Sequence, residues 1–372
     1  MAFLAMLGLS AALVAGFFGA LHPAFDSFAH FRIHFAVLMG LIALPLLATS
    51  FRLQAGVGLL LAVAAFASTL STLPRLWPVR AANDAAPGNE PVYRLLQMNL
   101  RFNNPTPKKV LSLIGRTNPD VITLDEVSAM WATELSYIQN AYPYRILCAH
   151  PDGVWGVALL SRRPFAAGTE PHCEPRGAMA AATVDFGGTP VDVAAIHLSW
   201  PWPKEQYWQI GELTETLTSL GETAIMAGDC NAVPWSAAVR RVASLGGLTV
   251  MPSAGPTWIH RTLPDFLRRY AGLPIDQVFS KGGVTILSST QMEETGSDHL
   301  PVMVEIFIDA RRDQAGRRGF YRDCVADPAQ HGRLDRTPRG LRFHKPTKAS
   351  MMRSTWPPSL CSRASNAICF AS

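Results

Sequence analysis

The pattern of apolar and polar positions divides the chain into four regions. Residues 1–73 are almost continuously apolar, whereas residues 92–308 alternate short apolar runs with amphipathic stretches. Residues 74–91, between them, are rich in Pro, Ala, Asn and Gly, which suits an exposed linker. Residues 309–372 have no apolar periodicity. The pattern predicts a membrane region, a linker, one folded domain and a disordered tail.

The first region contains three apolar windows, residues 2–20, 33–50 and 54–73. A helix that crosses a bilayer needs about 20 mostly apolar residues. A signal peptide would carry a positive N-terminus and a cleavage site before mature sequence. The first window has no Lys or Arg and is followed by further apolar segments, so we expect about three transmembrane helices.

The second region has the pattern of a soluble α/β domain. Helices are expected at 108–117 and 205–221, the latter closing at a C-cap, Gly221. Strands that run into loops are expected at YRLLQMNL (93–100), VITLDEV (121–127), VWGVALLS (154–161), VDVAAIHL (191–198) and TAIMAGD (223–229).

Charge separates the tail from the rest of the chain. Residues 310–372 carry 13 Lys or Arg and 4 Asp or Glu, against 20 and 24 in the remainder. A basic tail can bind anionic lipid headgroups or nucleic acid, but its lack of apolar periodicity favours a solvated extension. The slightly acidic remainder argues against nonspecific DNA binding, which depends on clustered Lys and Arg.

Two polar residues close expected strands early in the domain. Asn99 follows the run QM and Glu126 follows VITLD. An amide and a carboxylate at strand ends form a hard-oxygen site that suits magnesium, an ion that keeps several waters and needs one or two carboxylates. Each residue also has a structural interpretation, Asn99 as a turn residue and Glu126 as a helix start.

A second group of candidates surrounds the motif GDCN. Gly228 is expected to provide a sharp turn, Asp229 to align or deprotonate water, and Asn231 to hold a phosphoryl oxygen. An Asx-turn would use the same two polar residues without catalysis. His197 follows an uncharged apolar run, where a buried structural histidine is the alternative.

The last candidates lie in GSDHLPV, directly before an expected edge strand that ends the domain. Asp298 and His299 are adjacent there. The imidazole can stabilise charge on a transferring phosphoryl group or supply a proton to the leaving group. Asp276, in LPIDQVFS, is available to pair with that imidazole and fix its tautomer.

The order of these pieces resembles the endonuclease/exonuclease/phosphatase superfamily, the DNase I-like hydrolases. The resemblance covers about residues 92–308 and runs through MNLRFNN, PDVITLDEV, WGVALLSRRP, IHLSWPWP, GDCNAVPWS, PTW, IDQVFS and SDHLPV. It implies a two-sheet α/β sandwich with flanking helices, and hydrolysis of a phosphate ester with magnesium or, alternatively, manganese.

The resemblance also implies roles for the candidates. Asn99, Glu126 and Asp298 match metal-site residues, with Glu126 as the principal ligand. The catalytic candidates match a phosphate-stabilising histidine, a pair that positions water and phosphate, and an acid that orients the closing histidine; in this sequence they are His197, Asp229, Asn231, Asp276 and His299.

Two further positions lie in these motifs, Asp125, which departs from the family pattern, and Cys230, which lies within it. Asp125 stands where the family commonly has Gln, which would add negative charge near the metal. Cys230 separates Asp229 from Asn231, and we interpret it as a small packed residue rather than as a nucleophile.

The apolar N-terminal region makes the chain similar to the membrane-anchored bacterial branch, which includes glycopeptide-resistance proteins proposed to act on undecaprenyl pyrophosphate. A short tether would present a lipid-linked phosphate at high effective concentration. The stretch Trp200–Tyr207 is available to contact lipid, with a packed loop as the alternative. Two other functions stay open: a magnesium-dependent nuclease and a membrane scaffold without catalysis.

Two features of the sequence favour opposite sides of the membrane for the folded domain. With three spans, Arg32, Arg75 and Arg80 share the side of the domain, and by the positive-inside rule they favour the cytoplasm. Cys148 and Cys173 flank the expected hairpin at a spacing that can close a disulfide, which persists outside the cytoplasm. We expect a multi-pass protein of the plasma (inner) membrane with an external domain.

Overall fold

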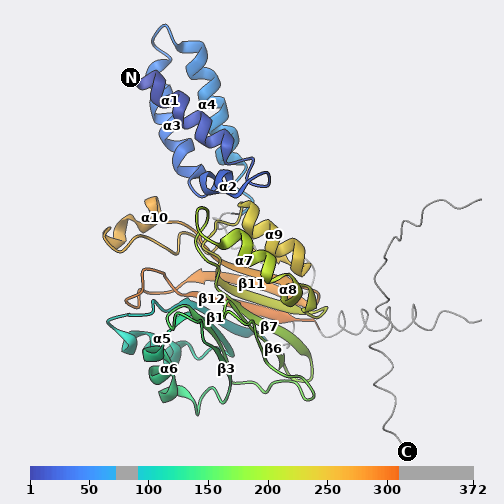
Figure 1. The fold of residues 1–372 in the computed structure, drawn as a ribbon. Helices are drawn as coiled ribbons and strands as arrows, with labels where there is room; N and C mark the ends of the chain where they lie inside the picture. Colours follow the sequence, from blue (N-terminus) through green and yellow to red (C-terminus); the bar gives the residue numbers. More distant parts are fainter. Residues whose placement is uncertain (73–90, 310–372) are drawn as a thin grey trace, which may run out of the picture. The chain divides into compact units, whose positions relative to one another are not determined.

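The computed structural model describes residues 1–72 and 91–309 of the chain (Figure 1). The helices are α1 (Ala2–Ala15), α2 (Pro23–Ala29), α3 (Arg32–Leu46), α4 (Arg52–Ala67), α5 (Pro107–Thr117), α6 (Ala129–Glu134), α7 (Gln206–Glu212), α8 (Thr214–Ser219), α9 (Ala237–Gly246) and α10 (Arg268–Ala271), with short 3-10 turns η1 (Leu135–Ile138) and η2 (Asp265–Leu267). The predicted linker and tail lie outside the described residues, apart from Pro91 and Asp309.

The domain is built on two six-stranded sheets. The first has the order β11 (Val284–Gln291), β12 (Val302–Ile308), β1 (Tyr93–Asn99), β2 (Val121–Val127), β4 (Gly156–Ser161) and β3 (Tyr144–Cys148). The second has the order β5 (His172–Cys173), β6 (Met179–Asp185), β7 (Pro190–Ile196), β8 (Ala224–Asp229), β10 (Asp276–Lys281) and β9 (Thr249–Val250). Only the central pairs β1–β2 and β7–β8 are parallel among the described strands.

The two sheets pack face to face and are covered by helices on their outer faces. Leu95 and Val304 of the first sheet meet Val193 and Ile225 of the second in one buried cluster. Helices α5 and α6 cover the first sheet, and α7, α8 and α9 cover the second (Figure 1). Because both faces of the central strands are covered, these strands are apolar on both sides. The predicted α/β sandwich is confirmed.

Most expected elements form where the apolar pattern places them, but two expectations about their ends are wrong. The strand before the C-terminal boundary is not an edge, because β12 lies between β11 and β1. The expected helix 205–221 breaks into α7 and α8 and ends at Ser219. Gly221 is not its C-cap; its backbone N–H donates to the Asp192 carboxylate at 2.6 Å instead.

The N-terminal helices are shorter than the three windows predicted from composition. Helices α1, α3 and α4 contain 14, 15 and 16 residues, and at about 1.5 Å per residue such lengths fall short of a hydrocarbon core of about 30 Å. Within residues 1–72 and 91–309 no single helix is long and apolar enough to cross a membrane, although the bent pair α2 and α3 passes the test of length and composition. The first window is shortened because α1 ends at Ala15 and the chain turns from Gly16 onward.

These helices bury small residues and expose large ones. Ala36, Ala43 and Ala62 lie inside the bundle, whereas Leu60 is 72% exposed and Val57 68%. Small side chains let helices approach closely. The outer surface of the bundle is therefore apolar, and an exposed apolar surface of this kind marks contact with a membrane or another protein.

Polar contacts join α2 to the catalytic domain. The Asp26 carboxylate accepts from the backbone N–H groups of Ala237 and Ala238, at 2.7 and 2.9 Å, and so caps α9. The Trp235 indole donates to the Ala29 carbonyl at 2.8 Å. A carboxylate at a helix N-terminus is stabilising because it satisfies free N–H groups and faces the positive end of the helix dipole.

The disulfide that the cysteine spacing allowed is formed in the structure. Cys148 ends β3 and Cys173 lies in β5, with a sequence separation of 25. These strands form one edge of the first sheet and one edge of the second. The bond therefore ties the two sheets together at one side of the sandwich.

Candidate active site

Four of the predicted residues lie at or directly beside the ends of strands. Asn99 is the last residue of β1 and Asp229 the last of β8, while Asp276 is the first of β10. Asp229 and Asp276 are direct partners across the antiparallel pair β8–β10. His197 follows β7 directly. The parallel pairs end at the same edge of the sandwich, which brings these side chains together.

Glu126 owes its position to an irregularity in β2. The β2–β4 register shifts between Asp125 and Val127, and Glu126 itself has a φ of 57°. Such a bulge re-aims a side chain, and a left-handed conformation at a residue other than Gly is found most often at functional sites. The Glu126 carboxylate accepts from the Asn99 amide at 3.1 Å and from the Phe102 N–H at 2.9 Å.

Asn99 links Glu126 to the catalytic carboxylates. Its amide N–H2 also donates to Asp229 Oδ2 at 3.0 Å, and its Oδ1 accepts from the Arg101 N–H at 2.9 Å. These three bonds fix which end of the amide faces the carboxylates. Asn99 therefore acts as a hydrogen-bond bridge in this structure, and its predicted role as a metal ligand stays a prediction.

Asp229 is the centre of the cluster. Its Oδ2 lies 3.5 Å from His299 Nε2 and 3.9 Å from His197 Nε2. The side chain is almost fully buried. Burial raises the pKa of Asp229 to about 6, and the neighbouring Asp276 acts in the same direction, although His299 opposes the shift. A carboxylate with a pKa close to neutral is suited to accept a proton from water.

His299 forms a buried ion pair with Asp276. Its Nδ1 lies 2.8 Å from Asp276 Oδ2. Burial alone would lower the pKa of His299, but the charges of Asp276 and Asp229 outweigh it and raise that pKa to about 10. Burial likewise opposes ionisation of Asp276, yet His299 lowers the pKa of this carboxyl overall. The imidazolium form is thus favoured at neutral pH.

Gln97 and Asp125 also belong to this site. Gln97 was not predicted from the sequence, and Asp125 was expected to add negative charge near the metal. Gln97 donates from one amide to both Asp125 and Asp276, at 3.0 Å each. Asp125 accepts from the Asp229 N–H at 2.8 Å. Burial, and next the charge of Asp229, raise the pKa of Asp125 well above its usual range. The neutral form is favoured, so Asp125 does not add the negative charge that its position suggested.

The GDCN segment combines a turn with packed residues. Asp229 Oδ1 accepts from the Asn231 N–H at 2.7 Å, which is the expected Asx-turn, and Asn231 has a φ of 45°. The prediction that Gly228 makes the turn is wrong, because Gly228 lies inside β8, where an added Cβ would sit 1.8 Å from the Ile196 carbonyl oxygen. Cys230 is buried in the core, which confirms its interpretation as a packed residue.

His197 and Asn231 are held by backbone carbonyls. His197 Nδ1 lies 3.3 Å from the Trp155 carbonyl oxygen, so that Nε2 is left to face Asp229. The Asn231 amide donates to the Leu198 carbonyl at 2.8 Å. Both side chains are largely buried, and their predicted contacts with a phosphate stay predictions.

Asp298 lies apart from this network. Its side chain is half-buried and lines a cavity of about 210 Å³ together with Arg101 and Arg261. Among the contacts of the described residues, no hydrogen bond joins its carboxylate to Asn99 or Glu126. The described residues that could hold a metal ion by spacing are Asp229, Asp276 and His299, whose ligand atoms lie within 4.8 Å of one another.

The fold is a two-sheet sandwich with a buried Asp–His–Asp cluster and a neighbouring glutamate at one edge. The chain belongs to the Endonuclease/Exonuclease/phosphatase family, whose model matches residues 96–299, more than half of the sequence. Members of this family are hydrolases of phosphoester bonds and typically depend on a divalent metal. No curated protein matches the chain.

Solved structures similar to this chain include three with low sequence identity. D. rerio TDP2 in complex with a single-strand DNA product is 19% identical over 59% of this chain and 100% of that chain, with a TM-score of 0.48. An endonuclease/exonuclease/phosphatase from Beutenbergia cavernae is 22% identical over 58% and 72%, with a TM-score of 0.44. Sphingomyelinase C from Streptomyces griseocarneus is 16% identical over 58% and 99%, with a TM-score of 0.42.

Proposed function

We propose that this chain is a membrane-anchored, magnesium-dependent phosphohydrolase that cleaves a phosphoester or pyrophosphate bond of a lipid-linked substrate by attack of water. The observation that carries the proposal is the pairing of two features in one chain. A buried cluster around Asp229 and His299 suits phosphoester hydrolysis, and it is joined to a helical bundle whose outer surface is apolar.

Glu126 is the side chain best suited to hold the metal. Its two carboxylate oxygens accept one hydrogen bond each, which leaves lone pairs free for an ion that keeps most of its waters. In the group formed by Asp229, Asp276 and His299, the two N–H groups of the imidazolium already face the two carboxylates, Nδ1–H toward Asp276 and Nε2–H toward Asp229, so we assign the metal to Glu126. Bound there, magnesium would supply stabilisation of negative charge on the phosphoryl group.

The remaining residues supply proton transfer and charge. Asp229 is placed to orient a water molecule and take its proton, since its pKa is raised to about 6. His299, held as an imidazolium by Asp276, is placed to stabilise the phosphoryl oxygens or to protonate the leaving oxygen. No covalent intermediate is required.

A lipid-linked substrate is supported by the surface beside the site. Trp200, Trp202 and Trp208 are 48%, 46% and 59% exposed, which supports contact of this stretch with lipid. Aromatic side chains of this type favour the membrane interface. A bilayer held against this surface would deliver its phosphate groups to the cluster.

We further propose that the catalytic domain faces the outside of the plasma (inner) membrane. The disulfide between Cys148 and Cys173 supports this side, because such bonds persist in oxidising compartments. Arg32, Arg75 and Arg80, predicted on the domain side, argue for the cytoplasm, so the proposed external side rests on the disulfide. Labelling of the cysteines in intact cells after reduction, with a membrane-impermeant thiol reagent, tests the assignment.

A substrate panel with the full chain tests the proposed reaction. We expect magnesium-dependent phosphate release from a lipid pyrophosphate in mixed micelles, abolished by Glu126→Ala and by His299→Ala with circular dichroism unchanged. Lys108→Ala, at an exposed position of α5, is the matched control. Plasmid DNA forms the second arm. Cleavage of the plasmid with no release from the lipid would make the chain a nuclease, and retained activity in both variants would remove the assigned site.

A further inference from the structure

Residues 259–271 expose large apolar side chains close to the catalytic cluster. Leu263, Phe266 and Tyr270 are 45%, 66% and 66% exposed, on a segment that contains the turn η2 and the short helix α10. Large apolar side chains that gather on one surface mark an interaction site, whereas single ones do not. The catalytic cluster uses none of the three, so their exposure indicates a separate role.

The segment has a fixed shape because Arg268 holds it together. This side chain is 6% exposed, and its guanidinium donates to the carbonyl oxygens of Thr257 and Asp298. It also donates to the carboxylate of Asp265, at 2.6 and 2.8 Å, which pairs the single acidic side chain of residues 259–271. An ordered segment loses little conformational freedom when it meets a partner.

The backbone of this region is joined to the catalytic histidine. The N–H of Ile259 donates to the Asp298 carbonyl at 3.2 Å, and Trp258 forms an isolated β-bridge with His299. A molecule that contacts the exposed side chains therefore lies next to the cluster.

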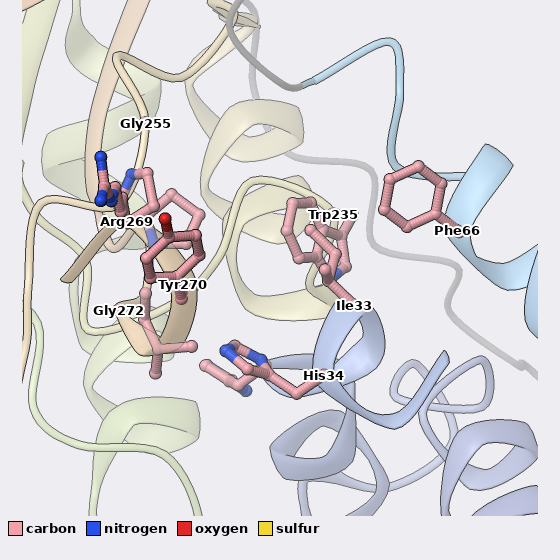
Figure 2. Close-up of a pocket in the computed structure, with 12 residues that line it drawn as sticks. Ile33, His34, Phe66, Trp235, Gly255, Arg269, Tyr270 and Gly272 are labelled. Atoms are coloured by element: carbon pink, nitrogen blue, oxygen red, sulfur yellow. The ribbon is translucent and has the colours of Figure 1, made fainter. Parts of the chain in front are cut away.

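The segment also meets the N-terminal bundle. Figure 2 shows His34 of α3 extending toward Tyr270, and backbone groups of Tyr270 and Ala271 interact with this imidazole. Residues three and four apart are neighbours on a helix surface, so Val37 and Leu38 lie directly beside this contact. Both are 49% exposed. The apolar surface of the bundle thus continues onto the segment.

A second exposed stretch borders the same region. The Trp200 ring packs edge-on against the Trp258 ring, with centroids 5.5 Å apart. The Trp202 carbonyl accepts from the Ser27 hydroxyl of α2 at 3.1 Å. The aromatic stretch for which we propose lipid contact is therefore connected both to the start of residues 259–271 and to the bundle.

We propose that residues 259–271 place Leu263, Phe266 and Tyr270 in the headgroup region of a lipid bilayer and thereby dock the catalytic cluster on the membrane surface. The structure favours a bilayer over a second copy of the chain because the segment borders the exposed surface of α3, which the proposed function places in the membrane. An aromatic ring with a polar tip, as in Tyr270, suits this interface. The proposal rests on that anchoring and deepens the proposed function, since it names the element through which the domain contacts lipid.

Photo-crosslinking of the full chain in phosphatidylcholine nanodiscs tests the contact, with EDTA present so that no turnover contributes. Phe266, Leu60 and Tyr137 are each replaced in turn by p-benzoylphenylalanine. We expect lipid adducts at position 266 and at position 60 on the bundle, and none at Tyr137, which is 74% exposed on η1.

The outcomes separate this proposal from the function on which it rests. Adducts at position 60 without adducts at position 266 would overturn the docking segment and leave the anchor in place. A crosslink from position 266 to a second chain in place of lipid would overturn it as well. No adduct at position 60 would remove the membrane anchor, and the docking segment with it.

Kinetics in proteoliposomes measures the consequence for substrate. Phe266→Ser is expected to raise KM for a lipid pyrophosphate about fivefold or more with kcat unchanged, because apolar area that is buried at the interface is lost. Phe266→Trp keeps a ring and should keep the KM of the wild type. Tyr137→Ser is the control, and a soluble phosphodiester should be hydrolysed equally by all variants. An equal loss on both substrates would indicate a structural role and overturn the proposal.

Discussion

The catalytic domain and the N-terminal bundle use apolar residues in opposite ways. In the domain, central strands bury Leu95 and Ile225 between sheets and gather polar groups at their ends. In the bundle, small residues such as Ala43 lie inside and large ones such as Leu60 face outward. The domain therefore holds charged groups in a fixed geometry, whereas the bundle presents an apolar surface that another molecule can cover.

The largest effect on activity is expected when the carboxylate of Asp229, at the centre of the catalytic cluster, is removed. Asp229→Asn keeps the side-chain volume but loses the carboxylate that accepts from Asn99 and faces both imidazoles. We expect kcat to fall by about 10³-fold or more, because both proton transfer and imidazolium stabilisation are lost. Steady-state kinetics at saturating magnesium measures the effect. A loss below tenfold would show that Asp229 is not the general base.

Asp276→Asn tests the partner of the imidazole. The charge of Asp276 is the main influence that raises the pKa of His299, so the variant should lower that pKa toward its ordinary range. The imidazolium is then lost as the pH rises through neutrality, and kcat should fall by about 10²-fold with an earlier alkaline decline. Imidazole NMR of the metal-free protein follows the titration directly; an unchanged titration would contradict the ion pair.

The disulfide supplies a test of stability without touching the site. The replacement of Cys148 and Cys173 by Ser, or reduction of the wild type, should lower the free energy of unfolding by about 3 kcal/mol, as expected for a loop of this length. Urea unfolding measures the change. Reductant should leave the double variant unaffected, and an equal effect of reductant on both proteins would exclude the bond as its cause.

The smallest effect is expected on the surface of the bundle. Leu60→Ser in detergent should change the free energy of unfolding by less than about 0.5 kcal/mol, because the side chain already faces outward. Leu124→Ala, at a fully buried position in β2, is the contrasting variant and should cost about 2 to 5 kcal/mol. A large loss at Leu60 would mean that this surface is covered by protein.

The family resemblance in the sequence predicted the sandwich, and most of the cluster could be located because Asn99, Glu126 and Asp229 each follow an apolar run. Asp229 and Glu126 could be located this way, since strands that are covered on both faces end in exposed loops. The contacts of Gln97 and Asp125 could not be predicted in this way. Gln97 lies on β1 and donates to Asp125 on β2 and to Asp276 on β10, a strand of the other sheet. Gln97, a polar residue within an apolar strand, was the feature of the sequence that could have indicated its part in the site.

The N-terminal region was predicted less well because composition does not determine where a helix breaks. The windows 2–20 and 33–50 are mostly apolar, yet the helices end at Ala15 and Leu46. Gly16 at the end of α1 and Pro45 in the last turn of α3 are local features at these ends. The use of Asp26 to cap α9 depends on tertiary contact, which no local pattern contains.

The central claim is that the Asp229–His299 cluster acts on phosphate presented by a membrane. The most direct measurement reconstitutes the full chain in lipid vesicles with magnesium and compares kcat/KM for a lipid-linked pyrophosphate with that for single-strand DNA. We predict phosphate release from the lipid substrate with kcat/KM at least about 100-fold higher, as expected for a substrate held at high effective concentration, and loss of that release in His299→Ala. DNA cleavage without lipid turnover would contradict the account.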